Sequence, residues 1–74
     1  MIVIDARELE PPEPFERVME ALSDLEPGGQ VKLILNREPF PLYRMLQLNG
    51  YRHSTTAFPD GHFEIVIAEE QSGD

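Results

Sequence analysis

The sequence predicts a two-layer α/β sandwich, in which two helices cover one face of a mixed four-stranded sheet. Three observations predict this fold. Segments with the two-residue period of strands and the 3.6-residue period of helices follow one another in the order β-α-β-α-β-β. Right-handed β-α-β crossovers place both helices on the same face of the sheet. A Pro59-Asp60-Gly61 turn then joins the last two strands as an antiparallel hairpin.

The first strand and the first helix occupy the N-terminal third of the chain. Ile2-Val3-Ile4 is a short β-branched run, and the prolines that follow it cannot continue a strand. A helix is predicted over 12–25, because Pro11 and Pro12 preset the backbone at its start and apolar residues recur on one helical face. The apolar residues of this face are Phe15, Val18, Met19, Leu22 and Leu25.

A second strand-to-helix passage repeats this order. Residues 30–36 are predicted to form the second strand. Its middle, residues 31–35, is apolar except for Lys32, which is typical of a central strand, and Ile34 lies on the face away from the helices. The residues expected to face the helices are Val31, Leu33 and Leu35. A second helix is predicted from about Pro41, and Asn49-Gly50 supplies its C-terminal cap.

The C-terminal part completes a single domain over residues 1–68. Residues 51–58 and 62–68 are the two strands of the predicted hairpin, and the polar residues 69–74 are expected to form a frayed tail. The sheet face away from the helices keeps three apolar residues among polar ones: Val3, Ile34 and Val66. Such a weakly apolar face is common in small domains, and a dimer or partner surface is the alternative.

Composition narrows the classes of function. The chain has 14 acidic and six basic residues, and its net charge of −8 repels the phosphates of nucleic acids and anionic lipids. It has no cysteine, which excludes disulfides, thiolate metal sites and cysteine nucleophiles. No apolar run approaches the ~20 residues that cross a bilayer, and no signal-peptide pattern is present. We therefore expect a cytoplasmic monomer or weak homodimer that binds neither nucleic acid nor membrane.

The passage from the first strand to the first helix contains Asp5-x-Arg7, followed by Pro12-x-Pro14. It resembles the TusA/SirA-like family of small sulfur-relay proteins, which read Asp-x-Arg-Gly-x-x-Cys-Pro-x-Pro between these elements. The resemblance covers the element order of residues 2–68 and implies the TusA/SirA-like fold. The Pro-Pro-Glu-Pro motif and Arg-Glu-Pro-Phe-Pro-Leu-Tyr at 37–43 resemble an uncharacterised branch of this family, a domain of unknown function.

One departure from the family pattern changes the expected chemistry. Pro11 stands at the position of the sulfur-carrying cysteine, and Glu8 replaces the usual glycine. Sulfur relay needs a thiolate that holds the persulfide, and this chain has no thiol. The resemblance therefore implies an architecture and the position of a site, and we expect no persulfide transfer by this chain.

Two arginines, Arg7 and Arg37, follow the two strands that are predicted to be parallel. Ligands of open α/β sheets bind beyond the carboxyl ends of the strands, where helix starts offer N–H donors. An anion site is one interpretation. The other, favoured by the many carboxylates nearby, is that each arginine pairs with an acid and holds its own loop in place. The acids available for such pairs are Asp5, Glu8, Glu13 and Glu38.

Aromatic residues and histidines give weaker signals. Phe40 and Tyr43 flank the second helix start, where they line an apolar cleft or, more commonly for such residues, belong to core and edge packing. Phe15 is expected to approach them. His53 and His62 lie too far apart along the predicted hairpin for a pair of metal ligands. We expect neither a metal nor a cofactor.

These observations predict a non-enzymatic accessory module that binds a protein partner or a small ligand, for example an anion. The predicted site is the space between the two strand-to-helix passages, residues 4–15 and residues 35–42, here called the mouth. The residues expected to contribute to it are Arg7, Glu13, Arg37, Phe40 and Tyr43. The alternative is an auxiliary component of a sulfur, redox or metal-centre pathway, acting on a partner that supplies the reactive group. Catalysis by the domain itself lacks a nucleophile, a thiol and a metal-ligand cluster.

Overall fold

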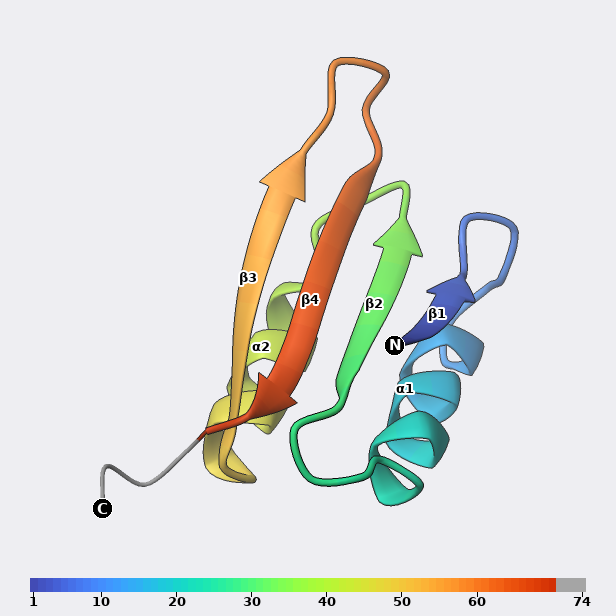
Figure 1. The fold of residues 1–74 in the computed structure, drawn as a ribbon. Helices are drawn as coiled ribbons and strands as arrows, with labels where there is room; N and C mark the ends of the chain where they lie inside the picture. Colours follow the sequence, from blue (N-terminus) through green and yellow to red (C-terminus); the bar gives the residue numbers. More distant parts are fainter. Residues whose placement is uncertain (71–74) are drawn as a thin grey trace.

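The predicted two-layer sandwich is confirmed by the computed structural model, which describes residues 1–70 (Figure 1). The elements are β1 (Ile2–Asp5), α1 (Glu13–Ser23), β2 (Gln30–Leu35), α2 (Phe40–Leu48), β3 (Tyr51–Ala57) and β4 (Phe63–Glu69). Both helices lie on the same face of the sheet (Figure 1). With 11 and 9 residues, α1 and α2 are too short to cross a bilayer, and no helix in residues 1–70 could do so.

The strand order of the sheet is β1-β2-β4-β3. β1 runs parallel to β2, whereas β4 is antiparallel to both of its neighbours, β2 and β3. The two apolar strands, β2 and β4, are therefore central, and the shorter or more polar strands form the edges. Because β1 and β2 are parallel, their carboxyl ends lie at the same end of the sheet. The loops that follow these strands, and the helices that they begin, meet there.

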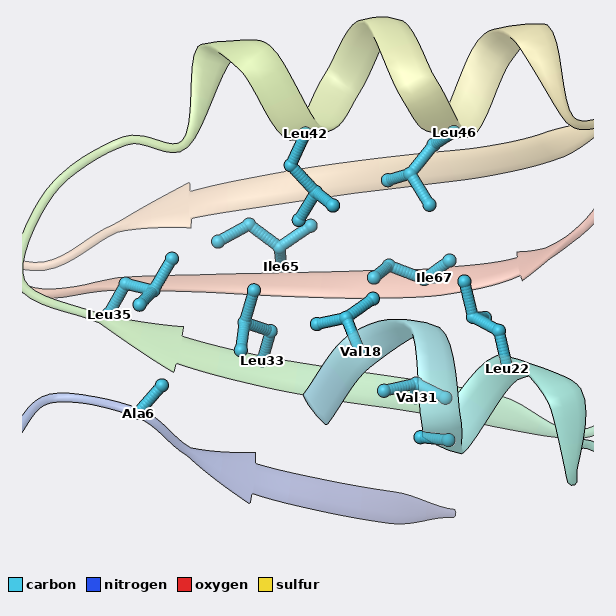
Figure 2. Packing of buried hydrophobic residues seen from close by; sticks show 11 residues of the cluster. Ala6, Val18, Leu22, Val31, Leu33, Leu35, Leu42, Leu46, Ile65 and Ile67 are labelled. Carbon is cyan, nitrogen blue, oxygen red and sulfur yellow. The ribbon is translucent and has the colours of Figure 1, made fainter. Parts of the chain in front are cut away.

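The core lies between the sheet and the two helices (Figure 2). Its largest fully buried side chains are Val18, Val31, Leu33, Leu46, Ile65 and Ile67. The alternation predicted for β2 is confirmed, with every second residue buried from Val31 to Leu35. The predicted buried face of α1 is wrong in part, because Phe15 and Met19 are each 40% exposed and Ala21 is buried instead.

The element boundaries differ slightly from those predicted. α1 ends at Ser23 rather than at position 25, because Asp24 and Leu25 donate to carbonyls only three residues back and leave the α-helical pattern. α2 begins one residue before Pro41, whose missing N–H is tolerated in the first helical turn. β4 extends to Glu69, and residues 71–74 of the predicted tail lie outside the described residues.

The two predicted turn glycines have the left-handed backbone that their positions require. Gly50, after the C-terminus of α2, has a φ of 81°, and Gly61, in the β3–β4 turn, has a φ of 95°. The amide of Glu70 donates to the carbonyl oxygen of Gly50 at 2.9 Å. This bond ties the end of β4 to the turn between α2 and β3.

Candidate functional site

The loops after β1 and β2 enclose a cavity of about 410 Å³ at the predicted mouth. It is bounded by residues of both loops, of both helix starts and of β2. The lining residues are Ala6, Arg7, Leu9, Pro11, Pro12, Pro14, Phe15, Leu33, Leu35, Asn36, Arg37, Glu38, Pro39, Pro41 and Leu42. Figure 2 shows four of them, Ala6, Leu33, Leu35 and Leu42, on the side of the sheet that carries the helices. We call this space the mouth cavity.

Two hydrogen bonds hold the loops that form the mouth cavity against each other. The Asn36 side-chain amide donates to the carbonyl oxygen of Arg7 at 2.9 Å. The amide of Ala6 donates to the carbonyl oxygen of Ile34 at 2.9 Å and extends the β1–β2 pairing by one residue. Ala6 is only 1% exposed, so this loop is anchored in the core. The mouth cavity therefore has a fixed frame rather than two independent loops.

The wall of the mouth cavity is mostly apolar. Eleven of its fifteen residues are apolar, and five of these are prolines. Its floor consists of residues that belong to the core: Ala6, Leu33, Leu35 and Leu42. The polar lining residues are Arg7, Asn36, Arg37 and Glu38. A few polar groups around an apolar floor are typical of small-ligand sites.

Arg7 pairs with an acid of its own loop, as the second interpretation predicts. Its Nε and a terminal nitrogen donate to the two carboxylate oxygens of Asp5 at 2.9 and 2.7 Å. The backbone amide of Arg7 donates to the same carboxylate at 3.2 Å. These hydrogen bonds from Arg7 lower the pKa of Asp5 from 3.8 to about 2. The charge of Arg7 is thus neutralised where it borders the mouth cavity.

Arg37 differs from Arg7, because it forms no ion pair with any carboxylate in residues 1–70. Its neighbour Glu38 is held elsewhere, since a Glu38 carboxylate oxygen accepts a hydrogen bond from the Tyr43 hydroxyl at 2.9 Å. The expectation that both arginines pair with nearby acids is therefore wrong for Arg37. A guanidinium without a carboxylate partner borders an apolar space.

The helix starts offer fewer amides than the anion-site interpretation requires. In α2, the amides of the first turn donate to the carbonyls of residues 38 and 39, and Pro41 has no amide hydrogen. In α1, the amides of Glu13 and Glu16 donate to the carbonyls of residues 10 and 12, and Pro14 has none. These first-turn donors are used within the chain, so they are not available to an anion in the mouth cavity.

Of the five residues predicted for the site, Arg7 and Arg37 line the mouth cavity, and three do not. Glu13 pairs with Arg17 at 3.0 Å along α1. Phe40 is 66% exposed on the surface of α2.

The motif residues of the first passage also differ in their positions. Pro11, at the position of the family cysteine, lines the cavity with Pro12 and Pro14, whereas the motif residue Asp5 does not.

Tyr43 is turned toward β3 rather than toward the mouth cavity. Its hydroxyl lies 2.6 Å from the Thr55 hydroxyl and donates to Glu38, and its ring stacks on His53 with the centroids 4.2 Å apart. Burial raises the pKa of Tyr43. Its role in the structure is therefore to join α2, β3 and the loop that contains Glu38.

Asn36 lines the mouth cavity and was not predicted as a site residue. In the sequence, Asn36 is a polar residue at the end of an apolar strand. Such a residue indicates where the strand ends, but it does not indicate which group the side chain will contact. The bond from Asn36 to the carbonyl oxygen of Arg7 joins positions 29 residues apart. No local pattern indicates such a contact.

His62 and His53 occupy separate environments. The Nδ1 of His62 lies 2.5 Å from an Asp60 carboxylate oxygen, and its ring stacks on Phe58 with the centroids 4.3 Å apart. Hydrogen bonds from His62 lower the pKa of Asp60. In the described part of the chain, no group of three or more histidines and acids is arranged to hold a metal ion.

The Asp5–Arg7 pair predicts acid sensitivity of the fold. Because folding lowers the pKa of Asp5 from 3.8 to about 2, the stabilisation by this pair is fully present above pH 3.8 and lost as the pH falls toward 2. We expect Asp5→Asn to reduce the loss of unfolding free energy over this interval, measured by urea denaturation at several pH values. Asp24→Asn is the control, because Asp24 forms no ion pair in residues 1–70. Identical pH profiles for Asp5→Asn and the wild type would contradict the expectation.

Comparison with known proteins places the fold and the family. No curated protein matches the chain. Among solved structures, the crystal structure of the SirA-like protein from Desulfitobacterium hafniense matches with a TM-score of 0.84 and 27% sequence identity. The match covers 96% of this chain and 100% of that chain. A family model described as "Uncharacterized conserved protein (DUF2249)" matches residues 3–69. The chain, which has a SirA-like fold, therefore belongs to the DUF2249 family.

Proposed function

We propose that this protein is a non-enzymatic binding module that takes a small ligand into the mouth cavity. The observation that carries the proposal is an apolar cavity of about 410 Å³ beyond the carboxyl ends of β1 and β2. Small-ligand pockets typically measure roughly 300–1,000 Å³. Open α/β sheets bind their ligands in this position.

The composition of the cavity wall supports binding rather than catalysis. None of the lining residues is a serine, threonine, cysteine, lysine or histidine. Its one carboxylate, Glu38, accepts a hydrogen bond from Tyr43 and has no nucleophile or second acid beside it in the cavity wall. Without a nucleophile or a general base that has a partner, the wall supplies shape and charge only. The absence of a thiol likewise supports the proposal that the chain itself transfers no persulfide.

A tryptophan at the rim of the mouth cavity tests the proposed site. Pro41 is exposed, lines the cavity and stands in the first turn of α2, so Pro41→Trp is expected to obstruct the opening without unfolding the domain. Leu48→Trp places the same side chain at the other end of α2, where Leu48 is 75% exposed. A panel of small fragments is to be titrated against both variants and the wild type, with binding measured by nuclear magnetic resonance.

The proposed site predicts that Leu48→Trp keeps the fragment affinities of the wild type. Pro41→Trp is expected to weaken them at least about tenfold, a loss of about 1.4 kcal/mol. Equal affinities for the two variants would place the binding elsewhere and overturn the proposal. A panel with no binder at all would also overturn it.

A second candidate function is supported by the position of Pro11. This residue stands where the TusA/SirA-like pattern has its cysteine, and it lines the mouth cavity. The cavity would then receive a reactive group from a partner in a sulfur, redox or metal-centre pathway. A photo-crosslinking residue at the exposed Phe40, compared with one at Leu48, tests this alternative. Selective capture of a cofactor-containing or persulfide-bearing partner through position 40 supports it, and equal capture at both positions contradicts it.

A further inference from the structure

We infer that the ligand of the mouth cavity is a small monocarboxylate with a short apolar chain, whose carboxylate pairs with Arg37. The inference rests on the proposed function and names the chemical class that this site would take. Three features of the cavity lead to it: an unpaired cation, an apolar floor and a wall that contains five prolines.

Charge determines the head group of the ligand. Two cations line the cavity, and the carboxylate of Asp5 neutralises Arg7 through two hydrogen bonds of 2.7 and 2.9 Å. Arg37 has no carboxylate partner in residues 1–70, and the hydrogen bond from Tyr43 engages the nearby Glu38. A guanidinium pairs with a carboxylate through two parallel N–H···O bonds. Arg37 can therefore form this pair with an incoming carboxylate.

The floor determines the body of the ligand. Leu33, Leu35 and Leu42 are at most 7% exposed in the folded chain and line the deep part of the cavity. A volume of about 410 Å³ is within the range of roughly 300–1,000 Å³ that is typical of small-ligand pockets. An apolar chain of about five carbon atoms fits this space with a carboxylate at its end. Each CH₂ group that it buries contributes roughly 0.8 kcal/mol.

The same wall disfavours a phosphate. Phosphate sites at helix starts rely on several backbone N–H donors, whereas five residues of this wall are prolines, which have none. Most first-turn amides of both helices already donate to carbonyls of the chain. The net charge of −8 also repels a dianion more strongly than a monoanion. A single guanidinium matches a single negative charge.

A set of six-carbon probes that differ only in the head group tests the inference. Hexanoate, 1-hexanol and hexyl phosphate are to be titrated against the full chain at neutral pH, with affinities measured from amide shifts. Hexanoate is expected to bind about tenfold more tightly than 1-hexanol, a preference worth about 1.4 kcal/mol. It is also expected to bind more tightly than hexyl phosphate.

Variants of the exposed arginines then assign the preference to one residue. Arg37→Gln is expected to reduce the affinity for hexanoate to about that for 1-hexanol. Arg44→Gln is the matched control, because Arg44 is an exposed arginine of α2 that does not line the cavity. It removes the same charge from the chain and is expected to keep the preference.

The outcomes separate this inference from the proposed function. Equal affinities for hexanoate and 1-hexanol, both abolished in Pro41→Trp, would overturn the monocarboxylate inference and leave the binding module intact. A preference for hexanoate that survives Arg37→Gln, or is lost equally in Arg44→Gln, would also overturn it. No binding of any probe at the mouth cavity would overturn the inference. If the fragment panel likewise had no binder, the proposed function would fail with it.

Discussion

Replacing Leu46 with alanine is expected to lower the free energy of unfolding by about 2–5 kcal/mol. Leu46 is 0% exposed and points from α2 toward the sheet (Figure 2). The substitution removes three buried carbon atoms and leaves a cavity that the packed core only partly fills. A domain of 74 residues has a stability of roughly 4–11 kcal/mol, so the variant is expected to be partly unfolded at moderate temperature.

Leu48→Ala is the matched control for this prediction. Leu48 lies two positions further along α2 and is 75% exposed, so the same substitution is expected to change the free energy of unfolding by less than about 0.5 kcal/mol. Urea denaturation of the two variants and the wild type gives both values. Equal losses for the two variants would show that α2 does not bury the face described here.

Tyr43→Phe is expected to lower the free energy of unfolding by about 1–3 kcal/mol. The hydroxyl of Tyr43 donates to the Glu38 carboxylate at 2.9 Å and lies 2.6 Å from the Thr55 hydroxyl. Removing this hydroxyl leaves the Glu38 carboxylate and the Thr55 hydroxyl without their hydrogen bonds to Tyr43, and it frees Glu38 beside the mouth cavity. Denaturation in urea measures the loss of stability.

Tyr51→Phe makes the same chemical change at a tyrosine of β3 that is also partly buried. Its hydroxyl forms no hydrogen bond in the described part of the chain, and a change within about 0.5 kcal/mol is expected. A loss of stability for Tyr51→Phe as large as that for Tyr43→Phe would contradict the structural role of the Tyr43 hydroxyl.

The element order and the layering could be predicted because their signals are local. Prolines, turn glycines and the two hydrophobic periods each act within a few residues of their own positions. The rotation of α1 could not be predicted in the same way, since Met19 and Ala21 are both apolar. The burial of Ala21 rather than Met19 depends on how α1 packs against the sheet, which is a property of the assembled core.

In the candidate site, too, the local contacts could be predicted from the sequence and the long-range contacts could not. The pair of Arg7 with Asp5 spans two residues and was among the pairs expected from the sequence. The direction of Tyr43 depends on the rotation of α2 against β3, and the bond from Asn36 to the carbonyl oxygen of Arg7 depends on the register of β1 and β2. Arg37 has no carboxylate partner in residues 1–70 because other side chains bind the nearby acids, and no sequence pattern predicts those contacts.

Above all, we propose that ligands bind in the mouth cavity. This proposal is tested by titrating the full chain with 1-hexanol and with hexanoate and measuring the chemical-shift change of each backbone amide. We expect the largest shifts at residues 6–9 and 35–42, which contribute most of the cavity wall. Lys32 and Val66 pair across β2 and β4 with their side chains on the opposite face of the sheet, so their amides are expected to shift little. The largest shifts on that opposite face, or no shifts at all, would contradict the site described here.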